Sequence, residues 1–198
     1  MGRSHSMSAP ATAMHRVPTT QARYTLPAIL LHWGMAALLL AQLAIGLYMV
    51  GLPKRTPAVG FYYGLHKSLG VLAFLLVMVR LWWRSRTPAP RGVGLHFSAL
   101  QEKMAQVSHR MLYACMVLIP LCGYLASSFG KHPVRFFGYA LPQLGWDSPL
   151  LQAFFRQLHA SLAWLLCALI AVHVLAVVRH LLSSGSLVLQ RMLPQLWR

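Results

Sequence analysis

Four apolar stretches, each about as long as a lipid bilayer is thick, dominate this sequence. A spanning α-helix needs roughly 20 mostly apolar residues, and lipid offers no partner for an open backbone group, so each stretch is expected to be helical. The composition agrees, because only 10% of the 198 residues are charged, against about 25% in a soluble domain. The predicted helices span about 26–50, 61–83, 105–128 and 150–182. Their short connections favour an all-α fold, an integral membrane four-helix antiparallel bundle.

The positive charge is distributed unevenly between the two ends of the predicted helices. Short cytoplasmic loops of membrane proteins carry an excess of Lys and Arg. One side carries twelve of the 18 basic residues: Arg3, Arg16, Arg23, Arg80, Arg84, Arg86, Arg91, Lys103, Arg110, Arg179, Arg191 and Arg198. The other side carries six: Lys54, Arg55, Lys67, Lys131, Arg135 and Arg156. The pattern predicts that both termini are cytoplasmic.

The segments outside the helices are expected to be two tails and a cap. Residues 1–22 are rich in Ser, Ala, Pro, Thr and basic residues, which predicts a disordered cytoplasmic tail rather than a signal peptide. The transmembrane domain is expected to cover 23–183, with a C-terminal cytoplasmic tail over 184–198. The stretch at about 129–149 is the longest on the outer side, and we expect it to form an ordered cap.

Net charge and cysteine spacing exclude two other classes of protein. The formal net charge is +16, but the cations lie at the ends of apolar runs, whereas a nucleic-acid binder presents them on a face of a soluble fold. The three cysteines lie inside apolar stretches without CxxC or CxxCH spacing, so neither a zinc site nor covalent haem attachment is indicated. Membrane lipid is therefore an expected partner, and nucleic acid is not.

Four histidines lie inside the apolar stretches, where ionisable side chains are costly and usually functional. His159 and His173 share the fourth stretch, and their spacing of fourteen residues separates them by about 21 Å on one helix face, within about 40°. Because successive helices are expected to alternate in direction, His32 falls at the inner level with His173. By the same argument His66 falls at the outer level with His159.

Two pairs of imidazoles at two depths are what two bis-histidine haem b groups require. Zinc or copper would need three or four ligands at one point. A proton relay normally uses acids within the membrane, whereas Glu102 and Asp147 lie outside it. Histidines that only bond one helix to another are the remaining alternative. A fifth histidine, His109, is a candidate for a hydrogen bond to a haem propionate or a quinone, or for a substitute ligand.

Small and basic residues accompany the four histidines. Glycines near the expected haem levels would let a flat macrocycle approach the helices, although ordinary helix packing accounts for each of them equally well: Gly46, Gly64, Gly70 and Gly123. Cations at the two levels are candidates for haem propionate contacts, with interfacial anchoring as the alternative: Lys67, Arg80, Arg84 and Arg110.

An ordered set of short motifs resembles the bacterial cytochrome b561 family over about residues 23–182. The motifs are LHW at 31–33, LHKSLG at 65–70, VRLWWR at 79–84, SHRMLY at 108–113, IPLCGY at 119–124 and LHA…VH from 158 to 173. The resemblance implies a multi-pass protein of the bacterial inner membrane with two non-covalent haem b groups. It assigns the ligands as His32 and His173 for the inner haem and as His66 and His159 for the outer haem.

One branch of that family is superoxide oxidase, which passes electrons from periplasmic superoxide to ubiquinone. The resemblance therefore implies a superoxide:ubiquinone oxidoreductase with ubiquinone as its electron acceptor. Outer cations would steer the superoxide anion, and Lys67, beside His66, is the first candidate. The other candidates are Lys54, Arg55, Lys131 and Arg156 for steering, and Trp33, His109 and Trp164 for the quinone site.

Two other functions would use the same haem arrangement. One is a membrane anchor and electron relay for a hydrogenase- or dehydrogenase-type complex. The other is a quinol-linked reductase of a soluble periplasmic acceptor. Haem ligands do not encode the substrate, so the sequence leaves these alternatives, and any redox partner protein, open.

Overall fold

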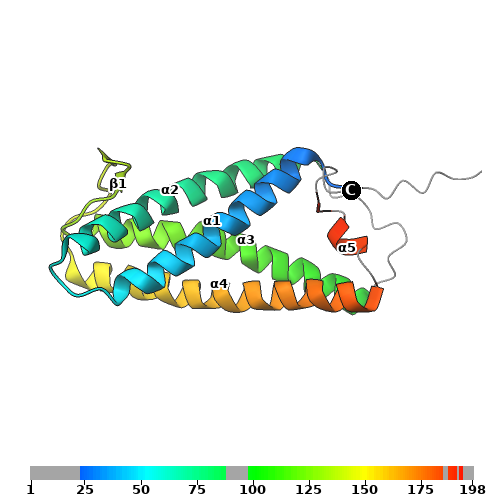
Figure 1. The fold of residues 1–198 in the computed structure, drawn as a ribbon. Helices are drawn as coiled ribbons and strands as arrows, with labels where there is room; N and C mark the ends of the chain where they lie inside the picture. The colour runs from blue at the N-terminus through cyan, green and yellow to red at the C-terminus, as the bar shows by residue number, and fades with distance from the viewer. Residues whose placement is uncertain (1–22, 88–97, 185–186, 191, 194–198) are drawn as a thin grey trace, which may run out of the picture.

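A computed structural model describes residues 23–87, 98–184, 187–190 and 192–193, and in that part the protein is mostly helical (Figure 1). The long helices are α1 (Leu26–Val50), α2 (Pro57–Arg86), α3 (Ala99–Ser128) and α4 (Pro149–Ser184). A short α5 (Leu187–Gln190) follows. Between α3 and α4 lie β1 (Arg135–Phe136) and β2 (Tyr139–Ala140), paired antiparallel with Arg135 opposite Ala140.

All four long helices are long and apolar enough to span a membrane, which confirms the prediction of four spanning segments. α2, α3 and α4 are longer than their hydropathy suggests, because polar residues at their ends remain helical. At the start of α3, for example, Ser98 Oγ accepts from the Gln101 N–H and the Gln101 side chain accepts from the Ser98 N–H. This capping box satisfies two backbone donors and begins the helix six residues before the apolar run.

Two small elements are present in addition to the four predicted helices, a β-hairpin and a short helix. The hairpin turn is formed by Phe137 and Gly138, which both have positive φ (47° and 98°), as the favoured two-residue hairpin turns require. It lies inside the stretch that was expected to form a cap. The second addition is α5, which lies inside the expected C-terminal tail over 184–198. The N-terminal stretch 1–22 lies outside the described residues.

The long helices lie side by side along one axis (Figure 1). α1 packs on α2, α2 on α3 and α3 on α4, whereas α1 and α4 have no comparable backbone contact in the described part of the chain. One end of the bundle carries β1 and β2, and we call it the hairpin end. The other end, where α1 begins and α4 finishes, we call the opposite end.

The outer surface of the helices is apolar. Leu30, Leu40 and Leu175, for example, are 60%, 57% and 65% exposed. Soluble monomers rarely expose continuous apolar surface on this scale, so these faces are suited to lipid. Few side chains of the described residues are fully buried, among them Met35 and Val77. The helices therefore enclose a thin apolar core, and polar rings occupy part of the space between them.

Candidate functional site

The four intramembrane histidines meet as two pairs between the helices. At the hairpin end, the ring centroids of His66 on α2 and His159 on α4 are 6.0 Å apart, with an angle of 80° between the ring planes. At the opposite end, the centroids of His32 on α1 and His173 on α4 are 6.4 Å apart, at 60°. All four side chains are half-buried. The structure thus brings together the two pairs that the depth argument predicts.

The spacing within each pair suits a metal ion held from two sides. A metal–imidazole nitrogen bond is about 2.0–2.1 Å long for zinc, and in a ring with bonds of about 1.33 Å each atom lies about 1.1 Å from the centre. Two imidazoles on opposite sides of one metal therefore have centroids about 6.3 Å apart. Aromatic rings in direct contact also have centroids about 4.5–7 Å apart, so the distance alone does not distinguish the two cases. The position of these costly polar rings inside apolar helices favours metal ligands.

His159 is held by the backbone of α3. Its Nδ1 lies 2.8 Å from the carbonyl oxygen of Ile119. Because a carbonyl only accepts, Nδ1 carries the proton and Nε2 is left with its lone pair. Gly123, one turn further along α3, has no side chain, and a Cβ there would lie only 3.0 Å from His159 Nδ1. The IPLCGY motif therefore supplies both an acceptor and room for the ring.

His66 has a related environment on α1. The Gln42 side chain donates from Nε2 to the backbone carbonyl of His66 at 3.0 Å, which joins α1 to α2. A Cβ on Gly46 would lie 3.3 Å from Cε1 of the His66 ring. Two buried polar atoms, His66 Nδ1 and Gln42 Oε1, have no hydrogen-bond partner among the described residues.

These contacts favour the packing alternative over contact with a macrocycle for three of the four glycines. Gly46 and Gly123 face the histidine rings, and a Cβ on Gly70 would instead meet the Gln42 amide at 3.2 Å. Only Gly64 faces open space, because a Cβ there would have nothing within 4 Å. Three of the four glycines therefore make room for side chains of the protein itself rather than for a macrocycle.

At the opposite end the neighbours are charged. Arg80 Nη2 lies 3.0 Å from Nδ1 of His32, and Arg80 Nε donates to the Tyr113 hydroxyl at 2.9 Å. Arg84 Nη1 also donates to that hydroxyl, at 3.5 Å, and both guanidinium groups lie near the Tyr113 ring. A guanidinium only donates, so Nδ1 of His32 is an acceptor here. Binding a metal through Nε2 then requires Arg80 to turn away, or the Nε2 proton to leave.

His109 belongs to the same polar cluster. Its ring centroid lies 5.3 Å from that of His173, so the opposite end holds three histidine rings in a row. Tyr113 follows His109 by four residues and hence shares its face of α3. Tyr113 was not among the predicted site residues, although the SHRMLY motif places it one turn from a polar residue inside an apolar helix.

The LHKSLG motif also joins α2 to the segment that follows α3. Lys67 Nζ donates to the carbonyl of His132 at 2.9 Å. Ser68 Oγ accepts from the Phe137 N–H at 3.0 Å and contacts the Arg135 carbonyl at 3.1 Å. Lys67, the residue after His66, therefore has a backbone partner in the segment that precedes the hairpin.

The other candidate residues are more scattered. Arg110 is exposed and makes no hydrogen bond or ion pair with any described residue. Trp164 is 65% exposed on the outer face of α4. Trp33 donates from its indole nitrogen to the Met192 carbonyl at 2.8 Å. Lys131 forms an exposed ion pair with Asp147 at 4.0 Å. The remaining steering candidates, Lys54, Arg55 and Arg156, have no such partner in the described part.

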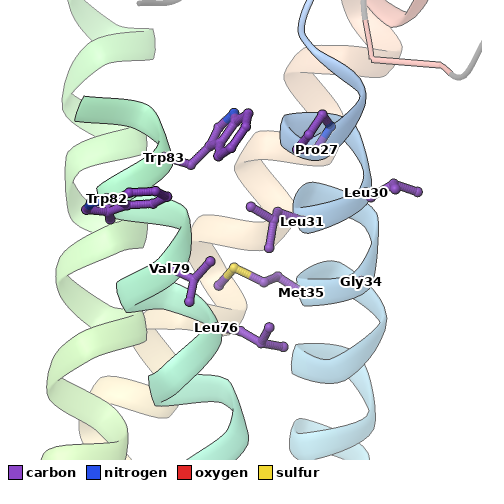
Figure 2. Close-up of a pocket in the computed structure, with 9 residues that line it drawn as sticks. All are labelled: Pro27, Leu30, Leu31, Gly34, Met35, Leu76, Val79, Trp82 and Trp83. Atoms are coloured by element: carbon purple, nitrogen blue, oxygen red, sulfur yellow. The ribbon is translucent and has the colours of Figure 1, made fainter. Parts of the chain in front are cut away.

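A separate cleft opens between α1 and α2 near the opposite end (Figure 2). It has a volume of about 490 Å³, and its walls include Leu31, Met35, Val79 and Trp82. Trp83 also lines it, but its indole N–H is directed to Thr25 Oγ1 at 3.1 Å. The cleft therefore suits an apolar chain such as a lipid tail, and it offers little to orient the two carbonyl groups of a quinone.

The arrangement favours a two-sided metal complex over a conventional metal site. Among the described residues, no group of three or more His, Cys, Asp or Glu is arranged to hold a metal ion. Two histidines that bind one metal from opposite sides leave the space between them free for a flat macrocycle around the metal. This donor set fits haem iron with two axial imidazoles.

Comparison with known proteins supports the same interpretation. The family model described as prokaryotic cytochrome b561 matches residues 23–195. Cytochrome b561 homolog 2 of Escherichia coli (strain K12) is 30% identical over 178 residues, which cover 88% of this chain and 93% of that protein. Cytochrome b561 homolog 1 of the same organism is 25% identical over 174 residues, covering 87% of this chain and 98% of the homolog.

Proposed function

This chain belongs to the prokaryotic cytochrome b561 family, and from that premise we propose that it is a di-haem oxidoreductase that passes electrons from periplasmic superoxide to ubiquinone. Membership of the family makes it a membrane cytochrome that binds haem b and transfers electrons. The observation that carries the proposal is the pair of histidine pairs, stacked along four membrane-length helices.

The first part of the proposal is the ligand set. His66 and His159 bind one haem at the hairpin end, and His32 and His173 bind the second at the opposite end. The centroid distances of 6.0 and 6.4 Å support this assignment, because opposed ligands on one metal require about 6.3 Å. Bound haem supplies the one-electron chemistry, while the protein sets its position and electrostatic environment.

The second part concerns the haem propionates. Arg80 and Arg84 have only neutral acceptors, the Tyr113 hydroxyl and the His32 ring, for hydrogen bonds in the described structure. A carboxylate is a stronger acceptor for a guanidinium than either. We assign the propionates of the opposite-end haem to Arg80 and Arg84, with Arg110 and His109 as further contacts. If Arg80 turns to a propionate, Nδ1 of His32 is released to carry a proton and Nε2 can bind iron.

The third part is the orientation. Contacts between α1 and α2 join Gln42 to His66 and His32 to Arg80, so higher numbers on one helix meet lower numbers on the other, as in an antiparallel bundle. The excess of Lys and Arg near the termini and the second connection supports a bacterial inner-membrane protein with both termini cytoplasmic. The hairpin end then faces the periplasm.

The fourth part is the substrate. Each superoxide gives one electron and leaves as O2, so two superoxide anions and two protons convert one ubiquinone to ubiquinol. Cations at the hairpin end raise the local concentration of an anion, and Lys67, the residue after His66, donates to the His132 carbonyl at that end. His66 and His159 would hold the haem at this end, and that haem would supply the one-electron chemistry for superoxide oxidation.

Lys67 variants test the substrate. In the purified holoprotein, Lys67→Met should slow haem reduction by superoxide and flatten its dependence on salt, while Lys67→Arg should stay near the wild type. Lys103→Met serves as the control, because Lys103 is an exposed lysine near the start of α3, at the opposite end, and is not a steering candidate. Equal rates for all four proteins, or no ubiquinol in the wild type, would contradict the proposal.

The same preparation addresses the alternative functions. A cytochrome that is the relay subunit of a hydrogenase- or dehydrogenase-type complex should co-purify with an iron–sulfur partner and show no response to superoxide. A quinol-linked reductase should be reduced by ubiquinol and reoxidised by a soluble periplasmic acceptor.

A further inference from the structure

Each of the two hairpin-end histidines lies against one turn of a neighbouring helix, although only the His159 ring makes a hydrogen bond there. On α3, Ile119 and Gly123 are four residues apart; the carbonyl of the first bonds to His159, and the second makes room for the ring. On α1, Gln42 and Gly46 have the same spacing; the first bonds to the backbone of His66, and the second faces its ring. Each histidine therefore rests on one turn of a neighbouring helix that ends in a glycine.

The glycine has a specific effect on the carbonyl one turn before it. A helical side chain leans toward the N-terminus and covers the turn that precedes its own Cα. A side chain at position 123 would therefore cover the Ile119 carbonyl, which already accepts a hydrogen bond within α3. Without that side chain, the second lone pair of the carbonyl is open to the imidazole N–H of His159.

We propose that Gly123 and Gly46 are positioning residues that leave room on the helix surface for the imidazoles of His159 and His66, the hairpin-end haem ligands. The hydrogen bond from His159 to the Ile119 carbonyl, which Gly123 permits, then lowers the reduction potential of the hairpin-end haem. This inference rests on the proposed haem ligation. At the opposite end no described glycine faces His32 or His173, so the device belongs to one haem only.

The link to potential follows from the chemistry of the second ring nitrogen. When the N–H of a ligating histidine donates to a carbonyl, the imidazole becomes a more basic ligand. A more basic ligand stabilises ferric iron over ferrous iron, and hydrogen bonding around an axial ligand is one of the protein's levers on potential. Displacing His159 from Ile119 should therefore raise the potential of the hairpin-end haem.

Gly123→Ala is the direct test. Its Cβ would lie 3.0 Å from Nδ1 and 3.1 Å from Cε1 of His159, so the ring must move. We expect potentiometric titration of the purified holoprotein to show one haem shifted upward by on the order of a tenfold change in its reduced-to-oxidised ratio, about 59 mV for one electron. That haem should also be lost more readily, by on the order of 10-fold or more, while the second haem is unchanged.

Control variants are available on the neighbouring helices. Gly60→Ala on α2 and Gly34→Ala on α1 place a methyl group where nothing lies within 4 Å, and both should keep the wild-type potentials. Gly46→Ala, with its closest contact at 3.3 Å, should loosen the same haem less than Gly123→Ala does. It also keeps the inference testable if Gly123→Ala does not assemble.

The outcomes separate this inference from the proposed function. If Gly123→Ala and Gly46→Ala match Gly34→Ala in both potentials and haem retention, the inference is wrong. If they weaken both haems equally, the glycines serve general packing and the inference is again wrong. A His159→Ala variant is measured in parallel: if it keeps two haems with unchanged spectra, the proposed ligation itself fails.

Discussion

The two histidine pairs have similar geometry and different surroundings. At the hairpin end, the ring contacts are a backbone carbonyl, from Ile119, and two glycines. At the opposite end they are a guanidinium, from Arg80, and a third imidazole, from His109. Among the described residues, the first pair thus has one ring hydrogen bond, from His159 to a main-chain acceptor, whereas the rings of the second pair contact side chains.

Because of this difference, the two ends should tolerate different amino-acid substitutions. A main-chain acceptor cannot be removed by substitution, so the hairpin-end pair is sensitive mainly to atoms that are added beside it. A side-chain donor can be removed, so the opposite-end pair is sensitive to atoms that are taken away. Under the proposed function, this gives a fixed site where electrons enter and a more adjustable site where they leave.

Removing a proposed haem ligand should have the largest effect. We expect His66→Ala and His173→Ala each to halve the haem bound per protein, because under the proposed ligation each histidine pair binds one haem. Haem content and absorption spectra of the purified variants would show this, and the residual spectra of the two variants should differ. Identical residual spectra, or complete loss of haem from both variants, would mean that the pairs are not independent sites.

Removing the guanidinium at the opposite end should have the next largest effect. Arg80→Met deletes a cation that the proposed function assigns to the propionates of the opposite-end haem, and loss of such a supporting group typically costs 10–100-fold in affinity. We expect this loss at the opposite-end haem alone, measured as haem transfer to a soluble acceptor. Arg86→Met is the control, because among the described residues Arg86 contacts the exposed Trp82 ring and neither histidine pair. Equal haem loss in both variants would remove Arg80 from the site.

A smaller effect is expected where the hairpin is attached to α2. Ser68 is 4% exposed and bonds to the backbone of Phe137 and Arg135. Ser68→Ala leaves the Phe137 N–H without its acceptor, at a cost of about 1–3 kcal/mol. Hydrogen exchange should quicken in the hairpin while haem content stays unchanged. If hydrogen exchange quickens equally around His32, the hydrogen bonds of Ser68 do not stabilise the hairpin end alone.

The sequence predicts the fold well because the membrane restricts it. Apolar runs of membrane length have one backbone solution, so the four helices and the depth of each histidine follow from counting residues. The same counting fails at the polar ends of helices, where capping decides. Ser98 begins α3 before its apolar run for that reason, and hydropathy contains no information on it.

The surroundings of the histidines were harder to predict. The pairing of His66 with His159 follows from depth, but the partner of a ring nitrogen depends on how neighbouring helices are rotated. Gly123 was a candidate either for contact with a macrocycle or for ordinary helix packing, and it faces the imidazole of His159. Lys67 was expected to be a steering charge, and it also donates to the His132 carbonyl. A motif identifies which residues matter without specifying their contacts.

The smallest effect is expected for the ion pair between Lys131 and Asp147. Within the hairpin end, this exposed ion pair can be compared with the buried Ser68 hydroxyl. Both side chains are largely exposed, at 81% and 56%, and their atoms are 4.0 Å apart. Exposed pairs of this kind contribute about 0–1 kcal/mol, because water screens the attraction and ordering two long side chains costs entropy. Asp147→Asn should therefore leave thermal unfolding and hairpin exchange unchanged, whereas Ser68→Ala should not. If Asp147→Asn loosens the hairpin as much as Ser68→Ala does, charge rather than the buried hydroxyl holds this segment beside His66.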